Sequence, residues 1–303
     1  MPSRRTSLAL AGALSATLAL ADCGGDASTG SGSAEDGLTV VASTNVYGSI
    51  ASSIAGDAAE VTSIIDDPSA DPHSFEADTR TQLALSRATI VVENGGGYDD
   101  FVDTMLAAAD NPDVTVVNAV EVSGKDTSGE FNEHVWYDLG TVRLVAQSIE
   151  TALSEASPDD AQTFQDNLTT FEAGLDTLQQ TIETDAATTT GVPVAITEPV
   201  PGYLLDALGA DDRTPVEFSE AIEEETDVPV DVLAETLALF TGKQVRALVY
   251  NEQTTGPQTE QVLTAARDNG VVDVPVTETL PEGKDYTTWM TENVDAIATA
   301  LGA

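Results

Sequence analysis

Residues 164–182 read FQDNLTTFEAGLDTLQQTI, and an apolar side chain recurs in this stretch at every third or fourth position. Successive spacings of four, three, four, three and four residues place such side chains on one face of an α-helix. A coiled coil with a second chain is the competing interpretation, but the stripe covers only about three heptads. We therefore expect one long helix over residues 158–185 that packs against its own chain. The residues of the stripe are Phe164, Leu168, Phe171, Leu175, Leu178 and Ile182.

On both sides of this helix, short runs rich in β-branched residues alternate with helical stretches. That alternation is typical of α/β folds with mostly parallel sheets. We therefore predict two α/β lobes, over residues 37–157 and 186–303, that the long helix joins. The candidate strands are Leu38–Ala42, Val61–Ile65, Thr89–Val92 and Val114–Val117 before the helix, and Pro193–Ile196, Val245–Tyr250 and Val272–Val276 after it.

A single long helix between two lobes restricts their relative motion. Binding proteins whose lobes are joined by several flexible crossovers close about a hinge, and a rigid helical connection resists such closure. We expect ligand capture to involve small local movements.

The N-terminus has the features of an export signal over residues 1–22. Arg4 and Arg5 precede an uncharged, largely apolar segment that is too short to span a membrane comfortably. Cys23, the only cysteine, follows directly, as in a bacterial lipoprotein box, although Asp22 stands where a small residue is usual. An ordinary signal beside an unmodified cysteine is the alternative. Residues 23–36 then form a lipidated cysteine with a flexible tether.

The charge of the chain is strongly negative. Eleven Lys and Arg face 52 Asp and Glu, for a net charge of −41. Such a surface repels nucleic acid and anionic lipid headgroups, so nucleic acid is excluded as a partner and cations are the natural ligands. The composition does not distinguish a protein adapted to high salt from one of a lineage whose proteins are generally acidic.

Two histidines and two glutamates occupy positions where a metal site is expected. His73 lies in a loop after the second candidate strand, and Glu198 and Glu278 each follow the end of a strand by two residues. Ligands of open parallel sheets bind beyond the carboxyl ends of the strands. His134 lies further from its strand. Two imidazoles and two carboxylates would suit a first-row transition metal. The alternative is that the histidines are hydrogen-bonded structural residues and the acids are solvated.

Five segments together resemble one known family. In chain order they are DPHSFEAD (71–78), NGGGYDDFVDTML (94–106), NEHVWYD (132–138), TEPVPGYLLDALG (197–209) and VTETLPEGKDY (276–286). Their order and spacing are similar to those of the metal-binding lipoproteins of bacterial ABC importers, the zinc/manganese solute-binding family known as cluster 9. The resemblance extends over residues 37–303 and includes the interlobe helix.

The resemblance implies a four-ligand metal site buried between two facing lobes. Its motifs place the ligands on His73, His134, Glu198 and Glu278, although the family usually has Asp at the fourth position. Trp136 and Asp138 match positions that support the site and are not expected as ligands. The implied partner is an ABC permease. We expect the protein to be a monomer, anchored to the outer face of the cytoplasmic membrane by a lipid on Cys23.

The identity of the metal stays open between Mn²⁺ and Zn²⁺, with Fe²⁺ a further option. Many zinc members carry a histidine-rich loop before the second ligand histidine, whereas this chain has EVSGKDTSGEFNE (121–133). Two carboxylates favour harder metals, but the general affinity order favours Zn²⁺.

Three other functions are compatible with parts of the sequence. A metallohydrolase needs an open coordination position and a general base, and no HExxH motif is present. We therefore do not expect an enzyme. A cell-surface adhesion lipoprotein and a binding protein for another solute are the remaining alternatives; Ca²⁺ would prefer six to eight oxygen donors and no histidine.

Overall fold

The computed structural model describes residues 37–68, 72, 75, 78–129 and 131–303. The predicted signal segment 1–22, Cys23 and the tether to residue 36 lie outside the described residues, as does His73. Gly37–Ala303 forms one compact unit. No helix in the described part of the chain is both long and apolar enough to cross a membrane.

The N-terminal lobe is built on a sheet of four parallel strands in the order β2-β1-β3-β4. Each of the four predicted strands is present, with bounds shifted by one or two residues. The strands are β1 (Thr39–Thr44), β2 (Glu60–Ile65), β3 (Ile90–Glu93) and β4 (Thr115–Asn118).

The C-terminal lobe repeats this arrangement, in the order β6-β5-β7-β8 and again with parallel pairing. The prediction of two α/β lobes with parallel sheets is confirmed. The strand β6 was not predicted, because two aspartates carry no strand pattern and only their pairing with β5 defines them. The strands are β5 (Pro193–Ile196), β6 (Asp211–Asp212), β7 (Ala247–Asn251) and β8 (Val272–Val276).

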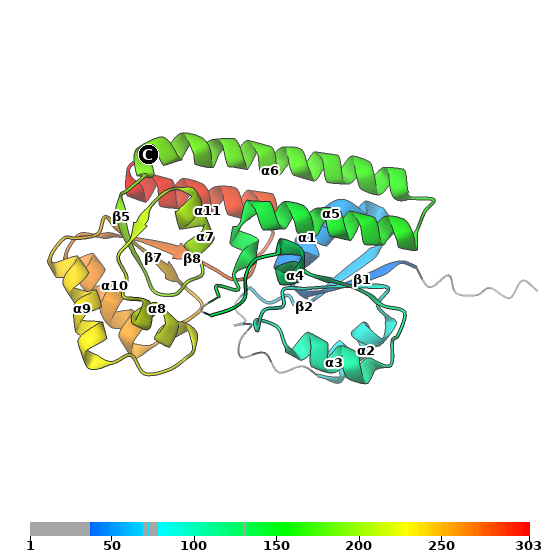
Figure 1. Ribbon diagram of the computed structural model, residues 1–303, viewed down its shortest axis with the longest axis horizontal. Coiled ribbons are helices and arrows are strands. Elements are labelled where there is room, and N and C mark those ends of the chain that lie inside the picture. The colour runs from blue at the N-terminus through cyan, green and yellow to red at the C-terminus, as the bar shows by residue number, and fades with distance from the viewer. Residues whose placement is uncertain (1–36, 69–71, 73–74, 76–77, 130) are drawn as a thin grey trace, which may run out of the picture. The chain divides into compact units, whose positions relative to one another are not determined.

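Helices connect and cover the strands (Figure 1). In the N-terminal lobe they are α1 (Asn45–Ala55), α2 (Thr79–Arg87), α3 (Phe101–Ala109), α4 (Ala119–Ser123) and α5 (Leu139–Ala156), with short 3₁₀ helices at Gly56–Ala58 and Val135–Tyr137. In the C-terminal lobe they are α7 (Gly202–Ala207), α8 (Val216–Glu223), α9 (Val230–Thr241), α10 (Pro257–Asp268) and α11 (Tyr286–Leu301).

The long interlobe helix is α6 (Ala161–Thr189), which runs along both lobes in Figure 1. It contacts α1 and α5 in the N-terminal lobe and α11 in the C-terminal lobe. The helix extends beyond residue 185 because Thr189 is buried and its hydroxyl donates a hydrogen bond to the Leu208 carbonyl, at 2.6 Å. Five residues of the predicted stripe are buried, namely Phe164, Phe171, Leu175, Leu178 and Ile182, and Leu168 is partly buried.

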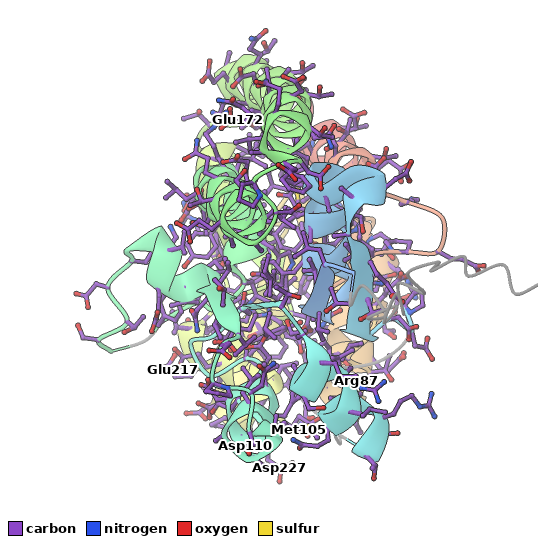
Figure 2. All side chains as sticks on the ribbon, turned by 90° about the vertical axis from the view of Figure 1, so that its right-hand side faces the viewer. Arg87, Met105, Asp110, Glu172, Glu217 and Asp227 are labelled. Carbon is purple, nitrogen blue, oxygen red and sulfur yellow. The ribbon has the colours of Figure 1, made fainter. Side chains whose placement is uncertain are left out.

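One apolar core passes through both lobes. It contains Val40 and Ile90 from the first sheet together with Val194 and Val249 from the second. Acidic side chains lie instead at the periphery, as Figure 2 shows for Asp110, Glu217 and Asp227, all of which are exposed. The high negative charge is thus largely a property of the surface, which makes buried carboxylates the informative exceptions.

Candidate metal centre

Three of the residues predicted to bind metal are buried at the lobe junction. His134 directly precedes the 3₁₀ helix Val135–Tyr137, while Glu198 and Glu278 follow the carboxyl ends of β5 and β8. Their exposed fractions are 0%, 3% and 2%. Buried ionisable side chains need partners or a bound ion, because burial without compensation disfavours their charged forms.

Hydrogen bonds fix the orientation of the His134 ring. Its Nδ1 lies 2.8 Å from Asn132 Oδ1, and the same oxygen accepts the His134 backbone N–H at 3.0 Å. An amide oxygen can only accept, so Nδ1 carries the proton and Nε2 presents a lone pair. The ring packs edge-on against Trp136, with centroids 5.1 Å apart. Nε2 is therefore prepared to bind a metal ion.

Glu278 lies opposite His134 and is held by three neighbours. Its Oε2 is 4.0 Å from His134 Nε2 and accepts a hydrogen bond from the Tyr98 hydroxyl at 3.1 Å. Its Oε1 accepts from Asn251 Nδ2 at 2.7 Å, and its backbone N–H donates to Gln253 Oε1. Tyr98 comes from the N-terminal lobe, so this carboxylate is positioned from both sides.

Burial disfavours the ionised form of Glu198 more than any nearby hydrogen bond favours it. Its Oε2 is buried and has no hydrogen-bond partner among the described residues. Burial raises the pKa of Glu198 to about 8, and the nearby charges of Glu223 and Glu278 add to the effect. Hydrogen bonds with Asn251 and Thr254 oppose it. A cation in this pocket would favour the ionised carboxylate.

Glu223, at the last position of α8, was not predicted as a site residue. Its Oε1 lies 3.5 Å from His134 Nε2, and its side chain is 11% exposed. The ligand atoms of Glu133, His134 and Glu223 all lie within 4.8 Å of one another. No helix was predicted over these residues, and nothing in the sequence separates Glu223 from the other acids nearby.

The two residues predicted to support the site, Trp136 and Asp138, make different contacts. Trp136 packs against the His134 ring, whereas Asp138 accepts the Gly140 N–H at the start of α5 and pairs with Lys125 at 2.7 Å. Tyr98 precedes α3, which begins at Phe101, and its hydroxyl donates to Glu278. Among the described residues, His134, Glu278 and Glu223 therefore lie together. Glu198 is close enough to interact electrostatically with Glu223 and Glu278.

Two parallel-sheet lobes, one long connecting helix and a buried histidine–carboxylate cluster at the junction define a two-lobed solute-binding protein with a donor set suited to metals. A family model described as ZnuA, zinc-uptake complex component A, periplasmic, matches residues 40–300. The chain belongs to this family.

Named relatives and solved structures are similar to most of the chain. It is 26% identical over 238 residues to the manganese-binding lipoprotein MntA of Halalkalibacterium halodurans, covering 72% of this chain and 77% of the relative. It is 25% identical over 267 residues to MntA of Bacillus subtilis, covering 86% and 85%. The solved structure of the SBP FpvC from Pseudomonas aeruginosa in complex with Mn²⁺ has the same fold, with a TM-score of 0.71, 21% identity and coverage of 87% and 98%.

Proposed function

We propose that this protein captures one divalent transition metal ion, Mn²⁺ or Zn²⁺, between its lobes and delivers it to an ABC importer. The observation that carries the proposal is the buried cluster around His134 Nε2, with Glu223 Oε1 at 3.5 Å and Glu278 Oε2 at 4.0 Å. A cation bound at His134 Nε2 would favour the ionised forms of both carboxyl groups. Membership in the zinc-uptake family and similarity to the two MntA lipoproteins support the same function.

The proposed ligands are His73, His134, Glu198 and Glu278. Imidazole nitrogen and carboxylate oxygen are accepted by Mn²⁺, Fe²⁺ and Zn²⁺ alike, so this set alone does not choose the cargo. Four protein donors would complete the shell of a tetrahedral Zn²⁺, and the sequence has no HExxH motif to supply a general base beside a metal-bound water, so we propose a receptor and not an enzyme.

We also propose a place for the protein in the cell. Residues 1–22 direct export, lipidation of Cys23 anchors the chain to the outer face of the cytoplasmic membrane, and the body acts as a monomer. The partner is the permease of a metal ABC importer, as is implied by the relatives that are named lipoproteins. Detergent partitioning of wild-type and Cys23→Ala protein tests the anchor, because only the lipidated form should enter the detergent phase.

The central test is metal binding by residues 24–303. Metal-stripped protein is offered equimolar Mn²⁺, Zn²⁺ and Fe²⁺ without oxygen, and the metal retained per chain is measured together with separate affinities. We expect one tightly held ion, lost in His134→Ala and Glu198→Ala and kept in Glu217→Ala, an exposed control on α8. A wild-type chain that retains no metal at micromolar concentration would overturn the proposal.

A further inference from the structure

We propose that Glu223 is an additional ligand of the cargo metal and biases the site toward Mn²⁺ over Zn²⁺. This inference rests on the proposed function, since it assigns a fifth side chain to the same centre. None of the motifs that define the four expected ligands includes Glu223, which lies between Pro215 and Pro229 in a segment rich in acids. The assignment comes from its position in the fold.

The geometry places Glu223 within reach of an ion bound at His134. Its Oε1 is 3.5 Å from His134 Nε2, closer than Glu278 Oε2 at 4.0 Å. Two donors of one metal ion, each about 2.1 Å from it, are typically about 3 Å apart, so the observed separation fits a shared ion. The independent observation is Glu198, whose Oε2 is buried and lacks a hydrogen bond from any described residue.

The fold holds Glu223 in this position by ending α8 there. Phe218 and Ile222 anchor one face of the helix in the apolar core of the C-terminal lobe. Glu225 adopts φ 51°, which stops the helix, and the Thr226 N–H donates to the Ala221 carbonyl at 2.8 Å. This closed turn fixes the backbone of Glu223, so its carboxylate is presented by a defined element and not by a loose loop.

A cation would favour a carboxylate in the position of Glu223. The C-terminal end of a helix carries partial negative charge and disfavours a nearby anion. Glu223 adds a carboxylate at such an end, where its charge also acts on Glu198. A divalent cation would offset all of these repulsions at once.

A third carboxylate changes which metal fits best. Zn²⁺ in closed protein sites is almost always four-coordinate and tetrahedral, and four ligands already complete its shell. Mn²⁺ prefers carboxylate and water oxygens in octahedral geometry, so a fifth protein donor contributes to its binding. Glu223 therefore adds more to the affinity for Mn²⁺ than to that for Zn²⁺.

The test compares wild type, Glu223→Gln and the control Glu224→Gln, a neighbouring exposed acid with the same substitution. Separate Kd values for Mn²⁺ and Zn²⁺ are measured by competition with chelators, after circular dichroism has confirmed the fold. We expect Glu223→Gln to weaken Mn²⁺ binding by about 10- to 100-fold and Zn²⁺ binding by clearly less, and Glu224→Gln to change neither. A crystal structure of the wild-type Mn²⁺ complex gives a second readout that needs no variant, with a Glu223 carboxylate oxygen expected to contact the ion.

The outcomes separate the two proposals. If wild type binds no metal, the proposed function fails, and this inference with it. If wild type binds but Glu223→Gln leaves both affinities unchanged, only the inference is overturned. An equal loss for both metals would keep Glu223 as a ligand and overturn the bias toward Mn²⁺. A wild-type Mn²⁺ complex in which Glu223 does not contact the ion would overturn the ligand assignment.

Discussion

Asn132 connects the two lobes at the centre through a single side chain. Its Oδ1 accepts from the His134 ring, while its Nδ2 donates to the Pro199 carbonyl at 2.9 Å, directly after Glu198. The Tyr203 hydroxyl donates to the Asn132 carbonyl at 2.7 Å and holds the backbone in place. One amide therefore sets the tautomer of His134 and the position of the loop that carries Glu198.

Replacing Asn132 with Ala should lower metal affinity by about 10- to 100-fold without unfolding the protein, as is typical when the partner of a ligating histidine is lost. Asn132→Asp keeps an oxygen acceptor for Nδ1 but loses the donor to Pro199, so we expect an intermediate affinity. Isothermal titration with Mn²⁺ and Zn²⁺ measures both. If the two variants had equal metal affinities, the orientation of the His134 ring would not be the cause of the lost affinity.

The raised pKa of Glu198 predicts that metal binding releases a proton. With a pKa of about 8, this carboxyl is mostly protonated at pH 7 in the metal-free protein, whereas the proposed role of Glu198 as a ligand requires the carboxylate. The affinity for the metal should therefore rise as the pH increases toward 8. Well above pH 8, metal binding should no longer release a proton from Glu198. Titration calorimetry in buffers of different ionisation enthalpy counts the protons. A binding heat that does not depend on the buffer at pH 7 would contradict this assignment.

At the scale of elements, the sequence predicted what periodicity encodes and missed what tertiary contacts decide. β5 and β8 have the predicted bounds, because flanking breakers and β-branched residues define them locally. α6 was predicted from its stripe, but its end depends on the buried contact of Thr189 with Leu208, which no local pattern shows. Motifs and strand ends predicted His134, Glu198 and Glu278 as ligands, and the structure buries all three. Glu223 was not singled out, because many acids of this chain look alike in sequence.

The packing of α6 can be tested at two glycines. Gly174 lies inside the helix, and a Cβ there would meet Thr287 Cγ2 at 3.4 Å, an ordinary contact. Gly174→Ala should raise the free energy of unfolding by about 0.5–1 kcal/mol, because alanine favours the helix. Gly191, just after the helix, has φ 75°, so Gly191→Ala should lower it by about 1 kcal/mol. Urea denaturation of the metal-free protein measures both, and a destabilised Gly174→Ala would mean that α6 and α11 pack too closely for a methyl group.

At the scale of the whole molecule, the lobes share too many contacts to behave as independent domains. Asn45 exchanges two hydrogen bonds with the backbone of Leu280, at 3.0 and 2.8 Å, and the Tyr286 hydroxyl donates to the Trp136 carbonyl at 2.8 Å. The rings of Tyr137 and Trp289 pack edge-on with centroids 5.5 Å apart. Together with α6 and the shared core, these contacts favour local adjustment around the metal over wide hinge closure.

The two tryptophans of the chain allow this coupling to be measured lobe by lobe. Trp136 reports on the N-terminal lobe in Trp289→Phe, and Trp289 reports on the C-terminal lobe in Trp136→Phe. Because the apolar core is continuous, we expect each metal-free variant to give the same urea midpoint by fluorescence and by far-UV circular dichroism. Each variant is compared only with itself, so a change in stability caused by the substitution does not affect the comparison. If fluorescence and circular dichroism gave separate midpoints, the lobes would unfold independently, and the core and α6 would not couple them as the structure indicates.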